Sequence, residues 1–375
     1  MQNSNNRHRE EKATFQVGNA FYNPQSKYVR DLGVLAAAVY KQDYGSLRVL
    51  DALAGCGVRS LRYYLESQAD YLWVNEGNRQ HNSTIQENLT SIAPEYFKLT
   101  HQDAHRVFFQ CYSDRDYYDL VDVDCFGSAV PYLNTMLWAT KIGGLMYLTC
   151  TDGRTLTGHP PEKTVRTYNA IARSHPAIQE QALRLVIGAT QQQAATKGLG
   201  IKPVFSLFTG RTYRIMLRLV AKPQINASNY GFLVYCRHCG NYQTFSWRKL
   251  NKVGCSCEHP AITVSGAMWL GKLHDRDLLK RYTTLARQWQ WHNIVELLDL
   301  MQGENDFPPY FYTLREIGNR GKLDLPKKSR LIAALQNKGY QAAATHIEAQ
   351  AIKTNTDIET VIAIAKLAKG IAKDI

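Results

Sequence analysis

Strand-like and helix-like stretches alternate along residues 28–150, and this alternation restricts the fold more than any other feature of the chain. Short runs rich in β-branched and aromatic residues occur at 47–53, 71–75, 98–100, 118–123 and 145–150. Helical stretches are predicted at 29–40, 58–67, 79–88 and 130–139. Because alternating strands and helices build βαβ units, the sequence predicts an α/β fold around a mostly parallel sheet.

The rest of the chain divides into further predicted parts. Two helices are expected within 161–197, and a hairpin at 204–208 and 213–220 is expected to add an antiparallel strand to the sheet. The predicted boundaries are 1–27 for an N-terminal extension, 28–222 for the first domain, 223–272 for a small cysteine module and 273–375 for an α+β, mainly helical C-terminal domain. The polar N-terminus lacks the apolar core of a secretory signal and is expected to be a short disordered lead-in.

The charge of the chain indicates an anionic partner. A net charge of +13 favours nucleic acid, although a generically basic protein is the alternative. Basic and aromatic residues interleave at 211–214 and 242–249, a pattern found on RNA-contacting surfaces and equally in ordinary strands. No apolar run reaches the roughly 20 residues of a membrane span. Four of the eight cysteines cluster and the others fall in predicted core elements, which predicts reduced thiols and a cytoplasmic protein.

Two carboxylates and an aromatic residue follow the strand predicted at 118–123. Asp122, Asp124 and Phe126 stand where its apolar run ends, and Gly127 allows a sharp exit. Ligands of open α/β sheets bind at the carboxyl ends of the strands. A carboxylate beside a stacking ring suits chemistry on the amino group of a nucleobase. The alternatives are a divalent-metal motif and a simple helix cap.

A glycine-rich turn follows the first strand. Gly55 and Gly57 within Asp51–Arg59 allow a ligand close to the backbone, but the turn lacks the full G-x-G-x-x-G of dinucleotide sites. It fits the shorter turn that holds S-adenosylmethionine. Glu76, at the tip of the next strand, suits binding of ribose hydroxyls, and Asp103, beside Ala104 after the third, suits an adenine amino group.

The clustered cysteines predict a structural zinc site. Cys236 and Cys239 form one close pair, and Cys255 and Cys257 form another after a hairpin-sized span. Four thiolates satisfy a tetrahedral ion and leave no open position for catalysis. His238 and His259 are possible substitutes, and four free thiols in a small core are the alternative.

Several motifs together resemble the tRNA (guanine-N2-)-methyltransferases that act at nucleotide 26, the N2,N2-dimethylguanosine tRNA methyltransferases. They span nearly the whole chain: Phe21–Pro24 with Arg30–Leu32, Asp51–Arg59, Asn75–Glu76, Asp122–Ser128, Thr149–Gly158, Gly339–His346 and Ile352–Asn355. Cys125 departs from the family pattern, which has proline there. Glu76 replaces aspartate, and Ala344 and Ala351 replace an arginine and a glycine.

The resemblance implies a Rossmann-like class I S-adenosylmethionine-dependent methyltransferase domain, a zinc module and a tRNA-binding C-terminal domain. The implied catalytic residues are Asp124, which accepts a hydrogen bond and then the proton from guanine N2, and Phe126, which stacks on the extruded base. The implied cofactor contacts are Arg30, Asp51, Ala54, Gly55, Gly57, Arg59, Glu76, Asp103, Ala104 and Asp122. The implied substrate contacts are Phe21, Tyr22, Asn23, Gly127, Asp152, His346 and Lys353.

The expected reaction is therefore methylation of the exocyclic N2 of a guanosine in tRNA, once and then again, by a monomer that contacts no membrane. Lys327, Lys328, Arg330 and Lys353 are candidate phosphate contacts in the C-terminal domain. Two alternatives remain at this point: an amino-group methyltransferase acting on rRNA or DNA, and an RNA-binding protein whose site has decayed.

Overall fold

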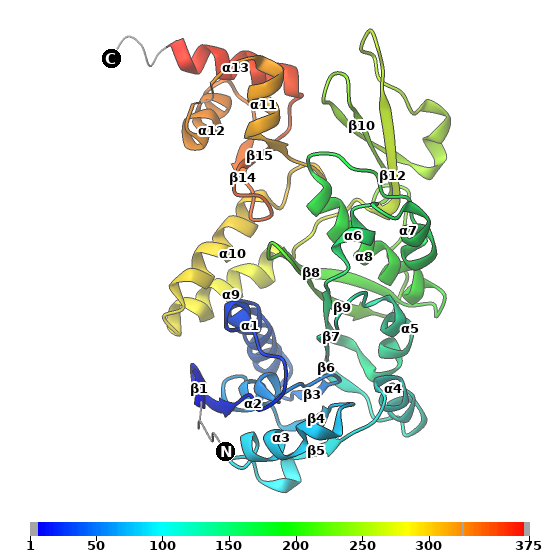
Figure 1. Ribbon diagram of the computed structural model, residues 1–375, viewed down its shortest axis with the longest axis vertical. Helices are drawn as coiled ribbons and strands as arrows, with labels where there is room; N and C mark the ends of the chain where they lie inside the picture. Colours follow the sequence, from blue (N-terminus) through cyan, green and yellow to red (C-terminus); the bar gives the residue numbers. More distant parts are fainter. Residues whose placement is uncertain (1–6, 325, 371–375) are drawn as a thin grey trace.

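The computed structural model describes residues 7–324 and 326–370, and its core is a mixed sheet covered by helices (Figure 1). Within these residues seven strands pair in the order β5-β4-β3-β6-β7-β9-β8. The first five are parallel, whereas β9 runs antiparallel to β7 and β8. The strands are β3 (Arg48–Asp51), β4 (Tyr71–Asn75), β5 (Phe97–Thr100), β6 (Tyr118–Val123), β7 (Thr140–Cys150), β8 (Gly200–Phe208) and β9 (Tyr213–Val220). The predicted α/β fold is confirmed.

Helices bury both faces of this sheet. They are α1 (Lys27–Tyr44), α2 (Val58–Leu65), α3 (Asn82–Asn88), α4 (Ala104–Ser113), α5 (Val130–Ala139), α6 (Gly153–Leu156), α7 (Pro161–Tyr168) and α8 (Ile178–Ala195). Every residue of β6 is buried, as expected for a central strand covered on both sides. Leu120 joins the apolar cluster of α1 and α2, whereas Val121 joins that of α4, α5 and α8. Successive strand residues point to opposite faces, so the two clusters lie on opposite sides of the sheet.

The predicted elements differ from the observed ones mainly at their ends. Helix α1 continues to Tyr44 and stops at Gly45, which has φ +74° and donates its N–H to the Lys41 carbonyl. Strand β7 begins five residues before the predicted Leu145, and helix α4 was not predicted. Its Asp103 N-cap accepts from the His105 N–H, a signal that could have located this helix.

The N-terminal extension is not a disordered lead-in from residue 7 onward. Strands β1 (Arg7–Glu10) and β2 (Ala13–Gln16) form a hairpin, and Ala13 and Phe15 are buried. The Asn88 side chain ties the hairpin to the end of α3 by accepting from and donating to the backbone of Gln16. That prediction is wrong for residues 7–16 because their alternating apolar side chains find a surface to cover; residues 1–6 lie outside the described residues.

The second half of the chain contains two small sheets and a helical region. The cysteine module pairs β11 (Tyr242–Ser246), β10 (Tyr230–Cys236) and β12 (Ile262–Trp269), with a 3-10 segment, η4 (Trp247–Lys252). The C-terminal region contains α9 (Arg276–Gln288), α10 (His292–Glu304), α11 (Leu314–Gly321), α12 (Lys328–Asn337) and α13 (Ile358–Gly370), with β13 (Tyr312–Thr313), β14 (Ala342–Ala344) and β15 (Ala351–Thr354). Among the described helices, none has the length and apolarity to cross a membrane.

Candidate active site

The loops that follow β3, β4, β6 and β7 open onto one cavity of about 440 Å³. Its position at the carboxyl ends of parallel strands is where α/β sheets bind ligands, and its size is ordinary for a small-molecule site. Ten predicted site residues line it: Phe21, Tyr22, Asn23, Arg30, Ala54, Gly55, Arg59, Glu76, Asp124 and Phe126. The strand-end reasoning therefore located the cavity correctly.

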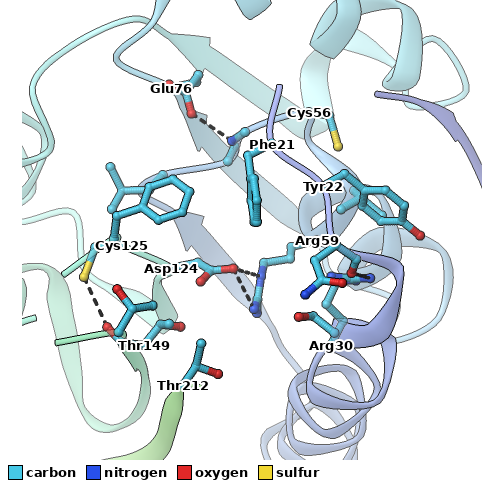
Figure 2. A pocket seen from close by; sticks show the side chains of 18 of the residues that line it. Phe21, Tyr22, Arg30, Cys56, Arg59, Glu76, Asp124, Cys125, Thr149 and Thr212 are labelled. Atoms are coloured by element: carbon cyan, nitrogen blue, oxygen red, sulfur yellow. Dashed lines mark hydrogen bonds and ion pairs between the residues drawn. The ribbon is translucent and has the colours of Figure 1, made fainter. Parts of the chain in front are cut away.

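One side of the cavity is the glycine turn with the Glu76 carboxylate beside it. Gly55 has φ +58°, a conformation that favours glycine, and its N–H donates to Glu76 Oε2 at 2.8 Å. Figure 2 shows this bond, and Glu76 Oε1 also accepts from the Asn78 N–H at 2.9 Å. Each carboxylate oxygen has a second lone pair, so Glu76 is fixed in place and still able to accept hydroxyl protons.

The opposite side of the cavity is the Asp124 carboxylate, held between two guanidinium groups. Arg59 Nε donates to Asp124 Oδ2 at 3.0 Å, and Arg214 Nη1 donates to Oδ1 at 2.8 Å. Desolvation favours the neutral acid, but the charges of Arg59 and Arg214 hold the pKa of Asp124 well below its usual range. The side chain is still 28% exposed. Asp124 therefore presents a permanently ionised, rigidly oriented acceptor to the cavity.

Asp122 and Asp51 lie behind the cavity, which corrects their predicted role as cofactor contacts. Asp122 is 1% exposed and accepts from Arg59 Nη1 at 2.9 Å and Tyr63 Oη at 2.7 Å. Asp51 is also 1% exposed and accepts from Ser60 Oγ at 2.7 Å; burial, with the nearby Asp122 charge, raises its pKa to about 7. The alternative divalent-metal motif of Asp122 and Asp124 is wrong too, because the Arg59 guanidinium pairs with both carboxylates at 2.9 Å.

An aromatic pair stands at the mouth of the cavity. The rings of Phe21 and Phe126 meet edge to face with centroids 5.1 Å apart. They are 69% and 73% exposed, which is unusual for phenylalanine. Figure 2 shows Phe21 projecting between Glu76 and Asp124. An exposed aromatic pair beside a carboxylate is suited to hold a planar ring.

The N-terminal hairpin positions part of the cavity wall. Glu10 is 2% exposed and accepts from Tyr22 Oη at 2.8 Å, Arg30 Nε at 2.9 Å and Arg62 Nη1 at 3.0 Å. Tyr22 and Arg30 both line the cavity. Arg30 also donates to the Asn23 carbonyl, so the strands at 7–16 fix the segment that carries Phe21.

Some lining residues were not predicted, and some predicted residues lie outside the lining. The unpredicted ones are Ser26, Leu53, Cys56, Val58, His81, Cys125, Tyr132, Thr149, Thr151, Thr212 and Arg214. Outside the lining are Gly57, Asp103, Ala104, Gly127 and Asp152, whose ligand contacts stay predictions. Arg214 belongs to a basic–aromatic stretch that suggested RNA contacts, but it is buried against Asp124 and the Thr149 hydroxyl.

His346 and Lys353 do not face solvent, so their predicted tRNA contacts are wrong. Lys353 is 2% exposed, and its Nζ pairs with Glu180 at 2.7 Å. The His346 side chain has no exposed area; its Nε2 donates to the Ser206 carbonyl at 2.8 Å and its Nδ1 contacts Glu304. Together with His274, these side chains form a buried seam between the C-terminal helices and the domain of the seven-stranded sheet. Lys327 and Arg330 are exposed, and their phosphate contacts stay predictions.

The four predicted zinc ligands lie together at one end of the cysteine module. Their sulfur atoms are all within 4.8 Å of one another, with 3.6 Å from Cys236 to Cys257 and 3.5 Å from Cys239 to Cys255. Four sulfurs bound tetrahedrally at 2.3 Å from one zinc would be about 3.8 Å apart. The donor set and its spacing fit zinc, and neither His238 nor His259 belongs to the cluster.

Comparisons with known proteins agree with this geometry. The sequence model of the N2,N2-dimethylguanosine tRNA methyltransferases matches residues 3–366. The chain is 26% identical over 373 residues to the tRNA (guanine(26)-N(2))-dimethyltransferase of Pyrococcus abyssi, covering 93% of each chain. Over 351 residues it is 28% identical to that of Saccharolobus solfataricus, covering 91% of this chain and 89% of the relative.

A solved structure extends the likeness to three dimensions. Trm1 from Pyrococcus horikoshii, in complex with S-adenosyl-L-methionine, aligns with a TM-score of 0.84 and 25% identity over 96% of this chain and 99% of that one. The alignment spans the sheet, the cysteine module and the C-terminal helices. This chain belongs to the N2,N2-dimethylguanosine tRNA methyltransferase family.

Proposed function

We propose that this protein transfers methyl groups from S-adenosylmethionine to the exocyclic N2 of guanosine 26 in tRNA. One observation carries the proposal: a fixed, ionised carboxylate and two exposed aromatic rings share a cavity with a glycine turn and a second carboxylate. The relatives, which are named tRNA (guanine(26)-N(2))-dimethyltransferases, support the tRNA substrate and the nucleotide.

The Glu76 side of the cavity suits the cofactor. Glu76 would accept the ribose hydroxyls, and the Ala54–Gly55 backbone would lie against the amino-acid part, because no side chain at Gly55 blocks the approach. When bound, S-adenosylmethionine supplies an electrophilic methyl group. Cys56 and His81 also line the cavity.

The Asp124 side suits the base. An N2 amino group inside a stacked helix is unreachable, so the guanosine must be extruded, and Phe21 and Phe126 would separate to stack on its faces. Asp124 would accept one N2–H, which orients the nitrogen and localises its lone pair. Most of the acceleration comes from this positioning, because the low basicity of Asp124 makes it a weak base before methyl transfer.

The same geometry supports two successive methylations. Guanine N2 carries two hydrogens. In each transfer the N2–methyl bond would form as the sulfonium–methyl bond breaks, and the N2 proton would then pass to Asp124, because an alkylated, positively charged N2 is far more acidic than a carboxylic acid. After the first transfer the remaining N2–H can still donate to Asp124, whereas after the second no hydrogen is left. The charged acceptor thus defines where the reaction stops.

The transfer assay is the direct test. The purified protein is incubated with labelled S-adenosylmethionine and unmodified tRNA, rRNA or DNA, and the digested nucleosides are separated. We expect label in N2-methylguanosine and then N2,N2-dimethylguanosine from tRNA alone, abolished by replacing guanosine 26. Transfer to rRNA or DNA would favour the first alternative, and cofactor binding without transfer would favour a decayed site.

We also infer a structural zinc ion held by Cys236, Cys239, Cys255 and Cys257. A fully thiolate site with no open position stabilises a module too small to have a large core. The expected stoichiometry is one zinc per chain by elemental analysis, falling to zero in Cys255→Ser/Cys257→Ser. That variant should lose protection of the β10–β12 module in hydrogen exchange. Retained zinc would contradict this ligand set.

The cytoplasmic location and the monomeric state stay predictions. None of the eight cysteines forms a disulfide, which suits a reducing compartment.

A further inference from the structure

A second hollow lies beyond the loop that carries Phe126, and the proposed reaction does not use it. It has a volume of about 450 Å³. Its lining includes Gly127, Ser128, Pro131 and Asp152, together with Lys163 and Arg166 from α7. Gly127 and Asp152 were predicted to contact substrate, yet both lie outside the first cavity, so this hollow gives them a common location.

Two loops, one after β6 and one after β7, are hydrogen-bonded to each other and form the wall between the two cavities. The Thr151 N–H donates to the Gly127 carbonyl at 2.7 Å, and the Gly127 N–H donates to Thr151 Oγ1 at 2.6 Å. Thr151 lines the catalytic cavity, whereas Gly127 lines the second hollow. Gly127 has φ +77° and open space where a side chain would stand. An RNA strand that places a base beside Phe126 therefore continues over a low, rigid wall into the hollow.

The hollow offers cations that the protein does not neutralise. Arg166 is exposed and forms no ion pair within residues 7–324 and 326–370. The Lys163 side chain is 60% exposed, and its Nζ is 3.8 Å from Asp152, whose Oδ1 already accepts from Thr155 at 2.7 Å. The two exposed cations, Lys163 and Arg166, suit the single negative charge of a phosphodiester. The Asp152 carboxylate suits a hydroxyl or amino donor of the same nucleotide.

We propose that this hollow binds the nucleotide adjacent to the target guanosine, with Lys163 and Arg166 on the phosphate that joins the two. The inference rests on the proposed function and adds a second contact with the same RNA strand. Because extrusion costs unstacking energy and phosphate contacts fix the position of the strand, the contact would help to keep the target guanosine in the catalytic cavity.

The test combines Lys163→Ala/Arg166→Ala with RNA that carries one neutral methylphosphonate linkage, placed either 5′ or 3′ of the target guanosine. The measured quantity is kcat/KM for methyl transfer. Lys202→Ala/Lys222→Ala is the control: it removes equal charge from exposed positions at the start of β8 and just after β9, at the end of the sheet opposite the cavity. S-adenosylmethionine binding and circular dichroism check that each variant is folded.

On native RNA we expect the α7 variant to lose about tenfold or more in kcat/KM and the Lys202/Lys222 control to lose much less. For one of the two linkages, the neutral substitution should cost the wild type a similar factor and the α7 variant almost nothing further. That linkage identifies the side on which the neighbour lies. The proposal would be overturned if both neutral linkages lowered the rate of the α7 variant as much as that of the wild type, or if the Lys202/Lys222 control lost as much as the α7 variant. Absence of any transfer by the wild type would instead refute the proposed function.

Discussion

The catalytic cavity and the buried seam are both built from carboxylates paired with cations, but only the cavity is open. Asp124 lies between two arginines, is 28% exposed and faces a cavity of about 440 Å³. Glu304 lies among His274, His346 and Lys353, is 3% exposed and borders a space of about 10 Å³, scarcely the volume of one water.

The two regions contain similar residue types, so residue type alone does not tell a reactive site from a stabilising one. What differs is whether a ligand can reach the carboxylate. In the seam the partners of Glu304 fill nearly all the space around it, and its role is to hold two parts of the chain together. In the cavity Asp124 pairs with two arginines, yet its side chain stays 28% exposed. Its carboxylate can therefore still accept a hydrogen bond from a ligand. The following predictions test this contrast in order of expected effect.

The largest effect is expected from Asp124→Asn. The amide keeps the shape of the side chain but loses the charge that orients the N2 hydrogen, so the single-turnover methyl-transfer rate should fall by about 10²–10⁴-fold. Calorimetric binding of S-adenosylmethionine should change little. Loss of cofactor binding in this variant would instead assign Asp124 to the cofactor part of the cavity.

Glu304→Gln should give the opposite result. Removing the buried charge leaves the cations around it without their partner, so the free energy of unfolding should fall by about 3 kcal/mol or more, measured in urea. The rate per folded molecule should be retained. Glu296→Gln, an exposed position on the same helix, is the matched control and should change stability by less than about 0.5 kcal/mol. If the two variants changed the free energy of unfolding equally little, the seam would not be a stabilising contact.

The two regions should also respond differently to pH. Burial, with the nearby His346 charge, holds the pKa of His274 well below 6.5, so the unfolded chain binds a proton that the native chain does not. Stability is therefore complete above about pH 6.5 and should fall as the pH falls below it, by up to about 1.4 kcal/mol per pH unit for this histidine. Burial also lowers the pKa of His175, to about 4, so this histidine adds to the loss of stability as the pH falls below about 6.5.

Asp124, in contrast, has a lowered pKa and stays ionised throughout that range. Single-turnover rates between pH 5 and 8 should therefore show no acid limb from this carboxyl, while urea unfolding at the same pH values becomes easier. His274→Asn should remove part of the stability slope and leave the rate profile unchanged. A rate that declines in parallel with stability would contradict the distinction.

The smallest effect is expected at Cys125, which stands where the family pattern has proline. Its Sγ donates to the Thr149 carbonyl at 3.2 Å and joins the ends of β6 and β7. Cys125→Ala removes this hydrogen bond and a little packing, so stability should fall by about 1 kcal/mol and the transfer rate by less than about tenfold. A larger loss of rate would show that the thiol itself orients Asp124.

The sequence located the cavity at the carboxyl ends of the strands because the signals for it are local. Gly55, Glu76 and Asp124 each follow a strand directly, and parallel strands bring their carboxyl ends to one edge. Arg214 could not be found in this way: it reaches Asp124 only because β9 pairs antiparallel with β7, opposite Thr149. The predicted tRNA contacts of His346 and Lys353 were wrong for a related reason. Such polar side chains are ordinarily exposed, and only tertiary packing, which the sequence does not reveal, buries these two.

The seam also has a consequence for how a tRNA would be measured. Lys353 pairs with Glu180 of α8 and His346 with the Ser206 carbonyl of β8, so the seam holds the C-terminal helices at one distance from Asp124. If these helices hold the tRNA, as the sequence predicts, the nucleotide presented to Asp124 is the one that this distance reaches. The choice of nucleotide is then set by length as well as by the chemistry of guanine.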